Sequence, residues 1–293
     1  LLAGLDLYVP LHAEELMIKC KGYMKYKMIV LDLDGTLTNN KKEITPKTKE
    51  ALMQAQAKGV HIVLASGRPT YGIIPLAEEL ELKTHGGFIL AYNGGKIIDC
   101  TNNRVLFEQK LDEKLVPMLY EGAKKAGLQI LTYQGEGIAA TQKDDKYVQI
   151  EAHINKMPVV QYDDFLRQLV YPINKCLIVG EPTKLHQLEL SLLAQLKGQM
   201  ELYRSADYFL ECVPLGIDKA QSLNRLITTL GITQEEVIAC GDGYNDLSMI
   251  RFAGLGVAMA NAAKDIQSEA DYITLSNEED GVAHVVEQFI LAE

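Results

Sequence analysis

Residues 28–37 read M-I-V-L-D-L-D-G-T-L, and they indicate the fold of the whole 293-residue chain. The apolar run 28–31 has the length of a strand and is typical of one buried on both faces of a parallel sheet. Residues i and i+2 of a strand point to the same side, so Asp32 and Asp34 are expected to face one spot at the strand's carboxyl end, where open α/β sheets bind ligands. Two neighbouring acids need a cation or a shared proton, and Mg²⁺ suits them because it prefers oxygen ligands. A plain turn, for which Asp-Gly is a common signal, is the alternative.

Composition limits the classes of partner. The formal net charge of -10 argues against a nucleic-acid backbone or an anionic membrane as the main partner. A small anionic substrate is still allowed, because a bound metal ion inverts the local field. The five cysteines are scattered and form no C-x-x-C pair, so we expect reduced thiols and a cytoplasmic protein. No apolar run approaches the ~18 residues of a membrane span, so neither nucleic acid nor membrane is predicted as a partner.

The order of apolar runs and helical patterns predicts a parallel sheet that an insertion interrupts. Strand and helix signals alternate from residue 28 to residue 92, which is typical of βαβ units. The middle of the chain changes to short strand patterns, with two helical patterns at 112–126 and 184–196, as in an α+β insert. The alternation resumes from residue 216. We therefore expect an α/β core of residues 25–84 and 213–293, an insert of residues 85–212, and a leader of residues 1–24 with no assigned role.

Several strand ends and loops carry polar residues that one sheet edge would bring together. These residues are Asp32 and Asp34, Ser66, Lys219, and the group Asp242, Asn245 and Asp246. Each has a plain alternative: Ser66 suits a helix cap, and an isolated Lys219 suits an exposed helix start. Gly241 and Gly243 lack the third glycine of a dinucleotide fingerprint, so NAD binding is not expected. A catalytic interpretation depends on the combination of these residues.

That combination resembles a known signature. D-L-D-G-T, then S-G-R after an apolar run, then an isolated lysine, then G-D-G-Y-N-D-L-S-M is similar to the four motifs of the haloacid dehalogenase (HAD) superfamily, and most similar to its Cof-type sugar-phosphate phosphatases. A-Y-N-G-G, Y-F-L-E-C-V-P and G-V-A-M-A-N-A support the resemblance, which covers the chain from about residue 27 to its end. Asp218 departs from the pattern, because asparagine is the usual neighbour of the lysine.

The resemblance implies a Rossmann-like, doubly wound parallel-sheet core with an inserted α+β cap domain, and it implies Mg²⁺ as the cofactor. Asp32 would be the nucleophile that attacks phosphorus and forms an aspartyl-phosphate. Asp34 would protonate the leaving oxygen and then activate water. The Asp32 carboxylate, the backbone carbonyl of Asp34 and the Asp242 carboxylate would hold the metal, with Asp246 as a nearby ligand or support.

The resemblance also implies which groups would surround the substrate. The phosphoryl oxygens would be bound by Ser66, the Gly67 amide, Lys219, Asn245 and the Leu33 amide. Thr36, Arg68 and Asn93 are candidate substrate contacts, and Arg68 and Asn93 equally suit structural roles. The cap would close over the site, exclude water and select the leaving group.

The function expected from this resemblance is Mg²⁺-dependent hydrolysis of small phosphorylated metabolites, with sugar phosphates as the foremost class, by a monomer or small homo-oligomer. A sugar phosphomutase is one alternative, which a basic patch in the cap would favour because a mutase holds a bisphosphate. A non-catalytic metal- or phosphate-binding regulator is the other. The intact pair Asp32 and Asp34 argues against the regulator, since a binder does not need the nucleophile.

Overall fold

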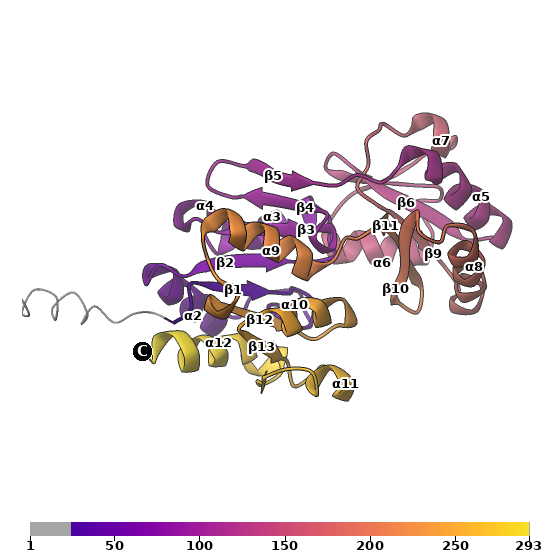
Figure 1. Cartoon of the computed structure of the whole chain (residues 1–293). Coiled ribbons are helices and arrows are strands. Elements are labelled where there is room, and N and C mark those ends of the chain that lie inside the picture. Colours follow the sequence, from indigo (N-terminus) through magenta and orange to yellow (C-terminus); the bar gives the residue numbers. More distant parts are fainter. Residues whose placement is uncertain (1–24, 293) are drawn as a thin grey trace, which may run out of the picture.

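The computed structural model describes residues 25–292, which form two lobes side by side (Figure 1). The expected leader, residues 1–24, lies outside the described residues. None of the helices within residues 25–292 is both long and apolar enough to cross a membrane. Cys100, Cys176, Cys212 and Cys240 are buried and free, as expected for reduced thiols.

The first lobe is built on an eight-stranded sheet in the order β14-β13-β12-β1-β2-β3-β4-β5. All neighbours from β14 to β3 pair in parallel, and β4 and β5 extend the edge as antiparallel strands. The strands are β1 (Met28–Leu31), β2 (His61–Ala65), β3 (Phe88–Ala91), β4 (Lys96–Asp99), β5 (Arg104–Glu108), β12 (Val237–Gly241), β13 (Leu255–Ala258) and β14 (Tyr272–Ile273).

Helices cover both faces of this sheet, because alternate strand residues point to opposite sides. Ile29 and Leu31 pack in the cluster that holds α2 (Pro46–Ala57), α3 (Thr70–Glu79) and α12 (Gly281–Val286). Met28 and Val30 pack toward α9 (Lys219–Leu230) and α10 (Leu247–Phe252). The shorter helices are α4 (Leu82–His85) and α11 (Lys264–Gln267). This arrangement confirms the expected doubly wound, Rossmann-like core.

The second lobe, called the insert below, is built on a six-stranded mixed sheet in the order β10-β11-β9-β6-β7-β8. Its strands are β6 (Gln129–Gln134), β7 (Gly137–Ala140), β8 (Val159–Gln161), β9 (Cys176–Val179), β10 (Met200–Ala206) and β11 (Phe209–Pro214), and its helices are α5 (Val116–Ala126), α6 (Lys146–Asn155), α7 (Phe165–Gln168) and α8 (Pro182–Gln195). Helices α5 and α8 pack on one face, while the other face turns toward the core and holds α6 (Figure 1).

The strand pairing places the start of the insert later in the chain than residue 85, where the sequence analysis expected it. β3, β4 and β5 lie in the core sheet, since β3 pairs in parallel with β2 and then continues into an antiparallel meander. Short strands joined by tight turns give the same sequence pattern in an antiparallel meander and in an α+β insert. The pattern alone therefore assigned β3, β4 and β5 to the insert. From sheet membership we propose a core of residues 25–109 and 215–292, with the insert at residues 110–214.

Candidate active site

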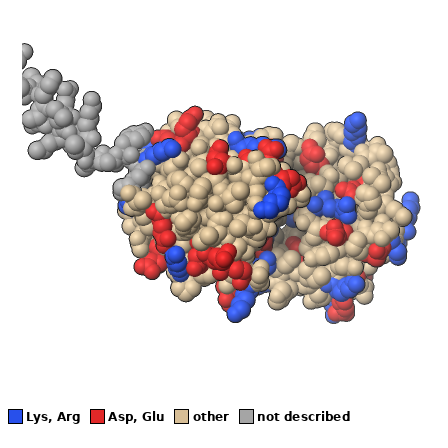
Figure 2. Space-filling model, turned by 90° about the horizontal axis from the view of Figure 1, so that it is seen from below, with Lys and Arg blue, Asp and Glu red and all other residues tan. Residues whose placement is uncertain are grey.

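The candidate site lies where three adjacent parallel strands end. Asp32 follows β1, Ser66 follows β2, and Asp242 follows β12, and the sheet order β12-β1-β2 places these carboxyl ends side by side. A cleft of about 320 Å³ opens above them and is lined by residues of both lobes. Seen from below, the surface is hollowed where the lobes meet (Figure 2). Residues separated by more than two hundred positions in the sequence thus meet at one cleft.

Three carboxylates and one lysine form the floor of this cleft. Carboxylate oxygens of Asp32, Asp242 and Asp246 lie within 4.8 Å of one another. Lys219, the first residue of α9, has a fully buried side chain, and its Nζ donates to Asp32 Oδ1 at 2.6 Å and to Asp246 Oδ1 at 2.5 Å. It also donates to the Ala65 carbonyl at 2.8 Å. One ammonium therefore joins the end of β2 to two of the acids.

Burial and mutual repulsion disfavour the ionised forms of the acids on this floor. Burial, reinforced by Asp246, raises the pKa of Asp32 well above its ordinary value. Burial likewise raises the pKa of Asp242 to about 6, although a hydrogen bond from Thr36 opposes the rise. Burial disfavours charge on Lys219 too, but the carboxylates of Asp246 and Asp32 outweigh it and raise the pKa of the lysine. The lysine is therefore cationic.

The floor fits a divalent cation. Its donor set is entirely carboxylate oxygen, the ligand type that Mg²⁺ prefers. With all three carboxylates ionised, one ammonium would leave two negative charges, and a divalent ion would neutralise them and so favour ionisation. Asp246 Oδ2 accepts the backbone N–H groups of Asp242 and Gly243 at 3.0 and 2.9 Å, which fixes the loop that carries Asp242. The Asp34 carboxylate does not belong to this trio.

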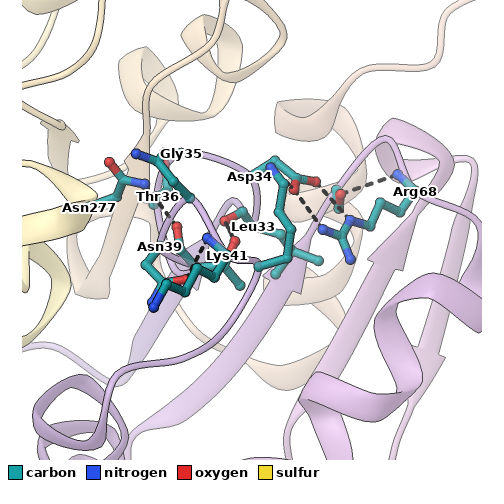
Figure 3. A network of polar contacts seen from close by, with 12 residues as sticks. Leu33, Asp34, Gly35, Thr36, Asn39, Lys41, Arg68 and Asn277 are labelled. Carbon is teal, nitrogen blue, oxygen red and sulfur yellow. Dashed lines mark hydrogen bonds and ion pairs between the residues drawn. The ribbon is translucent and has the colours of Figure 1, made fainter. Parts of the chain in front are cut away.

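Asp34 instead forms a salt bridge at the mouth of the site (Figure 3). Arg68 donates Nε to Asp34 Oδ2 at 2.7 Å and Nη2 to Oδ1 at 2.6 Å, a bidentate pair. Lys42 Nζ lies 2.7 Å from Oδ1 of the same carboxylate. Burial would raise the pKa of Asp34, but Arg68 and Lys42 hold it below its ordinary value. Arg68 therefore binds Asp34 in this structure, and the carboxylate is ionised.

The remaining predicted residues lie around the cleft in two groups. Ser66 and Gly67 form the loop after β2, where Ser66 Oγ accepts the Arg68 N–H at 3.2 Å. Asn245 Nδ2 donates to Asn93 Oδ1 at 3.2 Å, and Asn93 Nδ2 donates to the hydroxyl of Tyr203 in β10. Asn93 therefore links a loop of the core to a strand of the insert, which is a structural role.

Thr36 and Leu33 lie in the loop after β1, where Thr36 contacts one of the acids and Leu33 closes the loop. Thr36 is buried, and its Oγ1 donates to Asp242 Oδ1 at 2.8 Å, so it orients this carboxylate. The Leu33 carbonyl accepts the N–H and the hydroxyl of Thr38, which closes the tight loop that Figure 3 shows. Gly35 in this loop has φ +94°, and a Cβ there would overlap the Asp242 carboxylate.

The site also contains residues that were not predicted from the sequence. Lys42 pairs with Asp34, and Asn261 Nδ2 donates to the Gly35 carbonyl at 2.8 Å. Lys175 and Glu211 of the insert line the same cleft. Asn261 and Glu211 lie in segments that supported the resemblance, G-V-A-M-A-N-A and Y-F-L-E-C-V-P, which could have singled them out. Lys42 and Lys175 lie outside any motif, so pattern gave no signal for them.

The insert contributes a polar wall to the cleft. Lys175 Nζ donates to Glu211 Oε2 at 2.7 Å, and Ser205 Oγ donates to Glu211 Oε1 at 2.8 Å. Glu151, on α6, accepts hydrogen bonds from the Tyr133 hydroxyl at 2.5 Å and from Asn155 at 2.7 Å. The wall therefore offers carboxylate and hydroxyl oxygens, and its lysine is already paired.

Comparison with known proteins agrees with this geometry. Residues 29–286 match the sequence model of the haloacid dehalogenase-like hydrolases. The chain is 31% identical over 272 residues to the 5-amino-6-(5-phospho-D-ribitylamino)uracil phosphatase YcsE of Bacillus subtilis, covering 90% of this chain and 96% of that protein. The crystal structure of a haloacid dehalogenase-like hydrolase from Bacteroides thetaiotaomicron is 55% identical with a TM-score of 0.88, covering 90% and 99%. BT4131, described as a HAD subclass IIB sugar phosphatase, is 26% identical with a TM-score of 0.76, covering 90% and 98%.

Proposed function

Because this chain belongs to the haloacid dehalogenase-like hydrolases, we propose that its phosphatase activity is the Mg²⁺-dependent hydrolysis of small phosphorylated metabolites, with sugar phosphates as the substrate class. The observation that carries this proposal is the floor of the cleft. There Lys219 binds Asp32 and Asp246 while Asp242 lies within 4.8 Å, at the carboxyl ends of adjacent strands. A nucleophile, a cation site and a positive charge for phosphoryl oxygens are thus adjacent.

In the proposed reaction Asp32 is the nucleophile. Its Oδ1 accepts from Lys219, and among residues 25–292 no hydrogen bond occupies Oδ2, which is left for phosphorus. Attack by this carboxylate forms an aspartyl-phosphate and breaks the bond from phosphorus to the leaving oxygen. Water then attacks the aspartyl-phosphate, which releases inorganic phosphate and regenerates the Asp32 carboxylate.

Asp34 is the proposed acid and base, two residues further along the chain. As an acid it gives its proton to the leaving oxygen, and as a base it takes a proton from the attacking water. The pair with Arg68 and Lys42 favours its ionised form, which suits the second step. For the first step these cations have to move away from the carboxylate, so that Asp34 can carry a proton.

The phosphoryl group would be bound by positive charge and by backbone donors. Lys219, the Ser66 hydroxyl, Asn245 and the amides of Leu33 and Gly67 are the proposed donors to its oxygens. Asp32, Asp242 and Asp246 would hold Mg²⁺, together with the Asp34 carbonyl. When bound, the ion supplies positive charge that stabilises the phosphoryl oxygens in the transition state.

The polar wall of the insert is suited to bind a leaving group that carries hydroxyl groups, such as a sugar. Glu211, Ser205 and Glu151 of the insert line the cleft, and their side-chain oxygens can take part in hydrogen bonds. A mutase would need a second cationic site for a bisphosphate. The one lysine among the insert residues that line the cleft, Lys175, is paired with Glu211. We therefore propose a phosphatase, and no observation specifically favours the mutase or a non-catalytic regulator.

The test is phosphate release from a panel of sugar phosphates and other phosphorylated metabolites with Mg²⁺. Asp32→Asn is expected to abolish turnover and leave the circular dichroism spectrum unchanged, because the amide cannot form the acyl phosphate. Asp144→Asn, at an exposed aspartate of the insert, is the matched control and should retain full activity. An active Asp32→Asn variant, or a wild-type protein that releases phosphate from no ester, would contradict the proposal.

A further inference from the structure

We propose that Lys175 of the insert is a positioning residue that holds the Ser66–Gly67 loop of the core in its phosphoryl-binding conformation, so that the loop is complete only while the two lobes are docked. This inference rests on the proposed function, because it assigns a role at the same site. It identifies a contact by which the insert acts on the chemistry of the core without touching the phosphoryl group.

A single buried ammonium bridges the two lobes beside the cleft. Lys175 immediately precedes β9, and its side chain is 2% exposed. Its Nζ donates to the Gly67 carbonyl of the core at 2.9 Å and to Glu211 Oε2 of the insert at 2.7 Å. It also lies over the ring of Tyr133, 5.3 Å from its centroid. These contacts on three sides fix the position of the ammonium.

The contact with Gly67 determines the orientation of one peptide plane. The Gly67 carbonyl and the Arg68 N–H belong to the same peptide group. The carbonyl accepts from Lys175, and the N–H donates to Ser66 Oγ at 3.2 Å. Rotation of this plane would therefore break both bonds. Since Ser66 Oγ already accepts a hydrogen bond, its own hydrogen is left to donate to an anionic oxygen in the cleft.

The other hydrogen bonds of the loop come from the core itself. Asn93 N–H donates to the Ser66 carbonyl at 2.9 Å, and Tyr92 N–H donates to the Arg68 carbonyl at 3.0 Å. Among the described residues, Lys175 supplies the hydrogen bond that the loop receives from the insert. The Gly67 carbonyl would lose this partner when the lobes separate, and the loop would then depend on core contacts alone.

Glu211 explains how a charge can be kept at this buried position. Removing an ammonium from water is costly unless a counter-ion and hydrogen bonds compensate for it. Glu211 Oε2 supplies the counter-ion, and Ser205 satisfies the other oxygen, Oε1, at 2.8 Å. A buried ion pair contributes little net stability compared with an apolar pair, so its benefit has to be sought in the position that it gives to Gly67.

Two variants separate positioning from stability. Lys175→Met removes the ammonium and leaves Glu211 buried without its partner, so it is expected to lower both catalysis and stability. Lys175→Met combined with Glu211→Met removes the unpaired carboxylate as well, so stability should return while the Gly67 carbonyl still lacks its donor. Lys184→Met, at an exposed lysine of α8, is the control.

We expect Lys175→Met to lower kcat/KM about ten- to a hundredfold, the loss of one hydrogen bond to a charged donor. The factor should be the same for p-nitrophenyl phosphate and for a sugar phosphate, because the loop contacts the phosphoryl group that both share. With p-nitrophenyl phosphate, which offers no sugar to Glu211, the double variant should keep this loss and regain most of the wild-type midpoint of urea unfolding. A double variant that regains wild-type kcat/KM, or a loss confined to the sugar phosphate, would overturn the proposal.

A binding measurement separates this inference from the proposed function. Calorimetric titration of inorganic phosphate with Mg²⁺ present requires no turnover. Weaker phosphate binding by both Lys175 variants, with unchanged binding by Lys184→Met, is the expected result. Equal affinities in the wild type and the Lys175 variants would overturn the positioning role even if the enzyme is an active phosphatase. Wild-type protein that binds no phosphate would overturn both the role and the function.

Discussion

Replacing Lys219 by methionine should reveal how far one ammonium stabilises the acidic floor of the site. Methionine has nearly the same length and no charge. The Lys219 side chain is fully buried, and its Nζ contacts Asp32 at 2.6 Å, Asp246 at 2.5 Å and the Ala65 carbonyl at 2.8 Å. The variant leaves Asp32 and Asp246, which are 6% and 1% exposed, as buried carboxylates without a counter-ion.

The expected loss can be estimated from this geometry. Removing one partner of a buried ion pair costs about 3–5 kcal/mol, so in EDTA the free energy of unfolding should fall by roughly that amount. Mg²⁺ would supply the missing positive charge, so the difference between variant and wild type should narrow when Mg²⁺ is added. Turnover should fall about 10²- to 10³-fold even with Mg²⁺, because one donor to the phosphoryl oxygens is lost.

Urea unfolding with EDTA and with Mg²⁺, together with kcat/KM, measures these quantities. Lys83→Met, at an exposed lysine of α4, is the control and should match the wild type in all of them. A Lys219→Met protein that is as stable as the wild type in EDTA would refute the reasoning, because the carboxylates would then not need the ammonium. Wild-type kcat/KM in this variant would refute its phosphoryl-binding role.

Three further predictions follow from other contacts. EDTA should abolish turnover, and added Mg²⁺ should restore it. Mg²⁺ at a hundred times its Kd should raise the free energy of unfolding by about 2.7 kcal/mol. Turnover or urea unfolding that does not change on chelation would contradict the metal site. Gly35→Ala and Gly59→Ala should each lower the free energy of unfolding by roughly 1–2 kcal/mol, because alanine is strained at φ +94° and +91°. Only Gly35→Ala should also weaken Mg²⁺ binding in calorimetry, since its Cβ would crowd Asp242 while Gly59 faces open space. Equal Mg²⁺ affinities of the two variants would contradict this prediction. Burial raises the pKa of Glu151 in the folded protein above its value of about 4.3 in the unfolded chain. The free energy of unfolding should therefore fall as the pH rises from about 4.3 through the raised pKa, because the folded protein has to ionise a buried carboxyl group. Glu151→Gln should therefore be more stable than the wild type at pH 8 and lose this advantage near pH 4, and a difference that is constant across urea titrations from pH 4 to 8 would contradict it.

The sequence predicted the part of the fold that depends on local pattern. The run 28–31 is a buried strand, and the alternating strand and helix signals between residues 28 and 92 correspond to β1, α2, β2, α3 and β3. The meeting of Asp32 with Asp242 could be predicted because parallel strands end at one edge. These features need only the periodicity of the chain and the rules of sheet topology.

Other features depend on how the lobes pack, and pattern could not give them. β4 and β5 carry no signal that assigns them to the core sheet or to the sheet of the insert. Helix α6 was missed because its apolar residues alternate with polar ones, a pattern typical of a strand, although Glu151 and Asn155 on it line the cleft. The contact of Lys175 with Gly67 joins residues 108 positions apart in different lobes. Only the docked arrangement of core and insert reveals it.

The salt bridge of Asp34 bears on the order of steps in the proposed reaction. Arg68 and Lys42 hold the carboxylate ionised, whereas the first step needs it protonated. A phosphoryl group carries negative charge, so on entering the cleft it competes with Asp34 for both cations. As they turn toward the substrate, the pKa of Asp34 rises because its burial is no longer offset. Departure of the leaving group would let the pair form again, and an ionised Asp34 is then the base that the hydrolytic step requires. Substrate binding would thus itself supply the change in protonation, and free enzyme would keep Asp34 inactive as an acid.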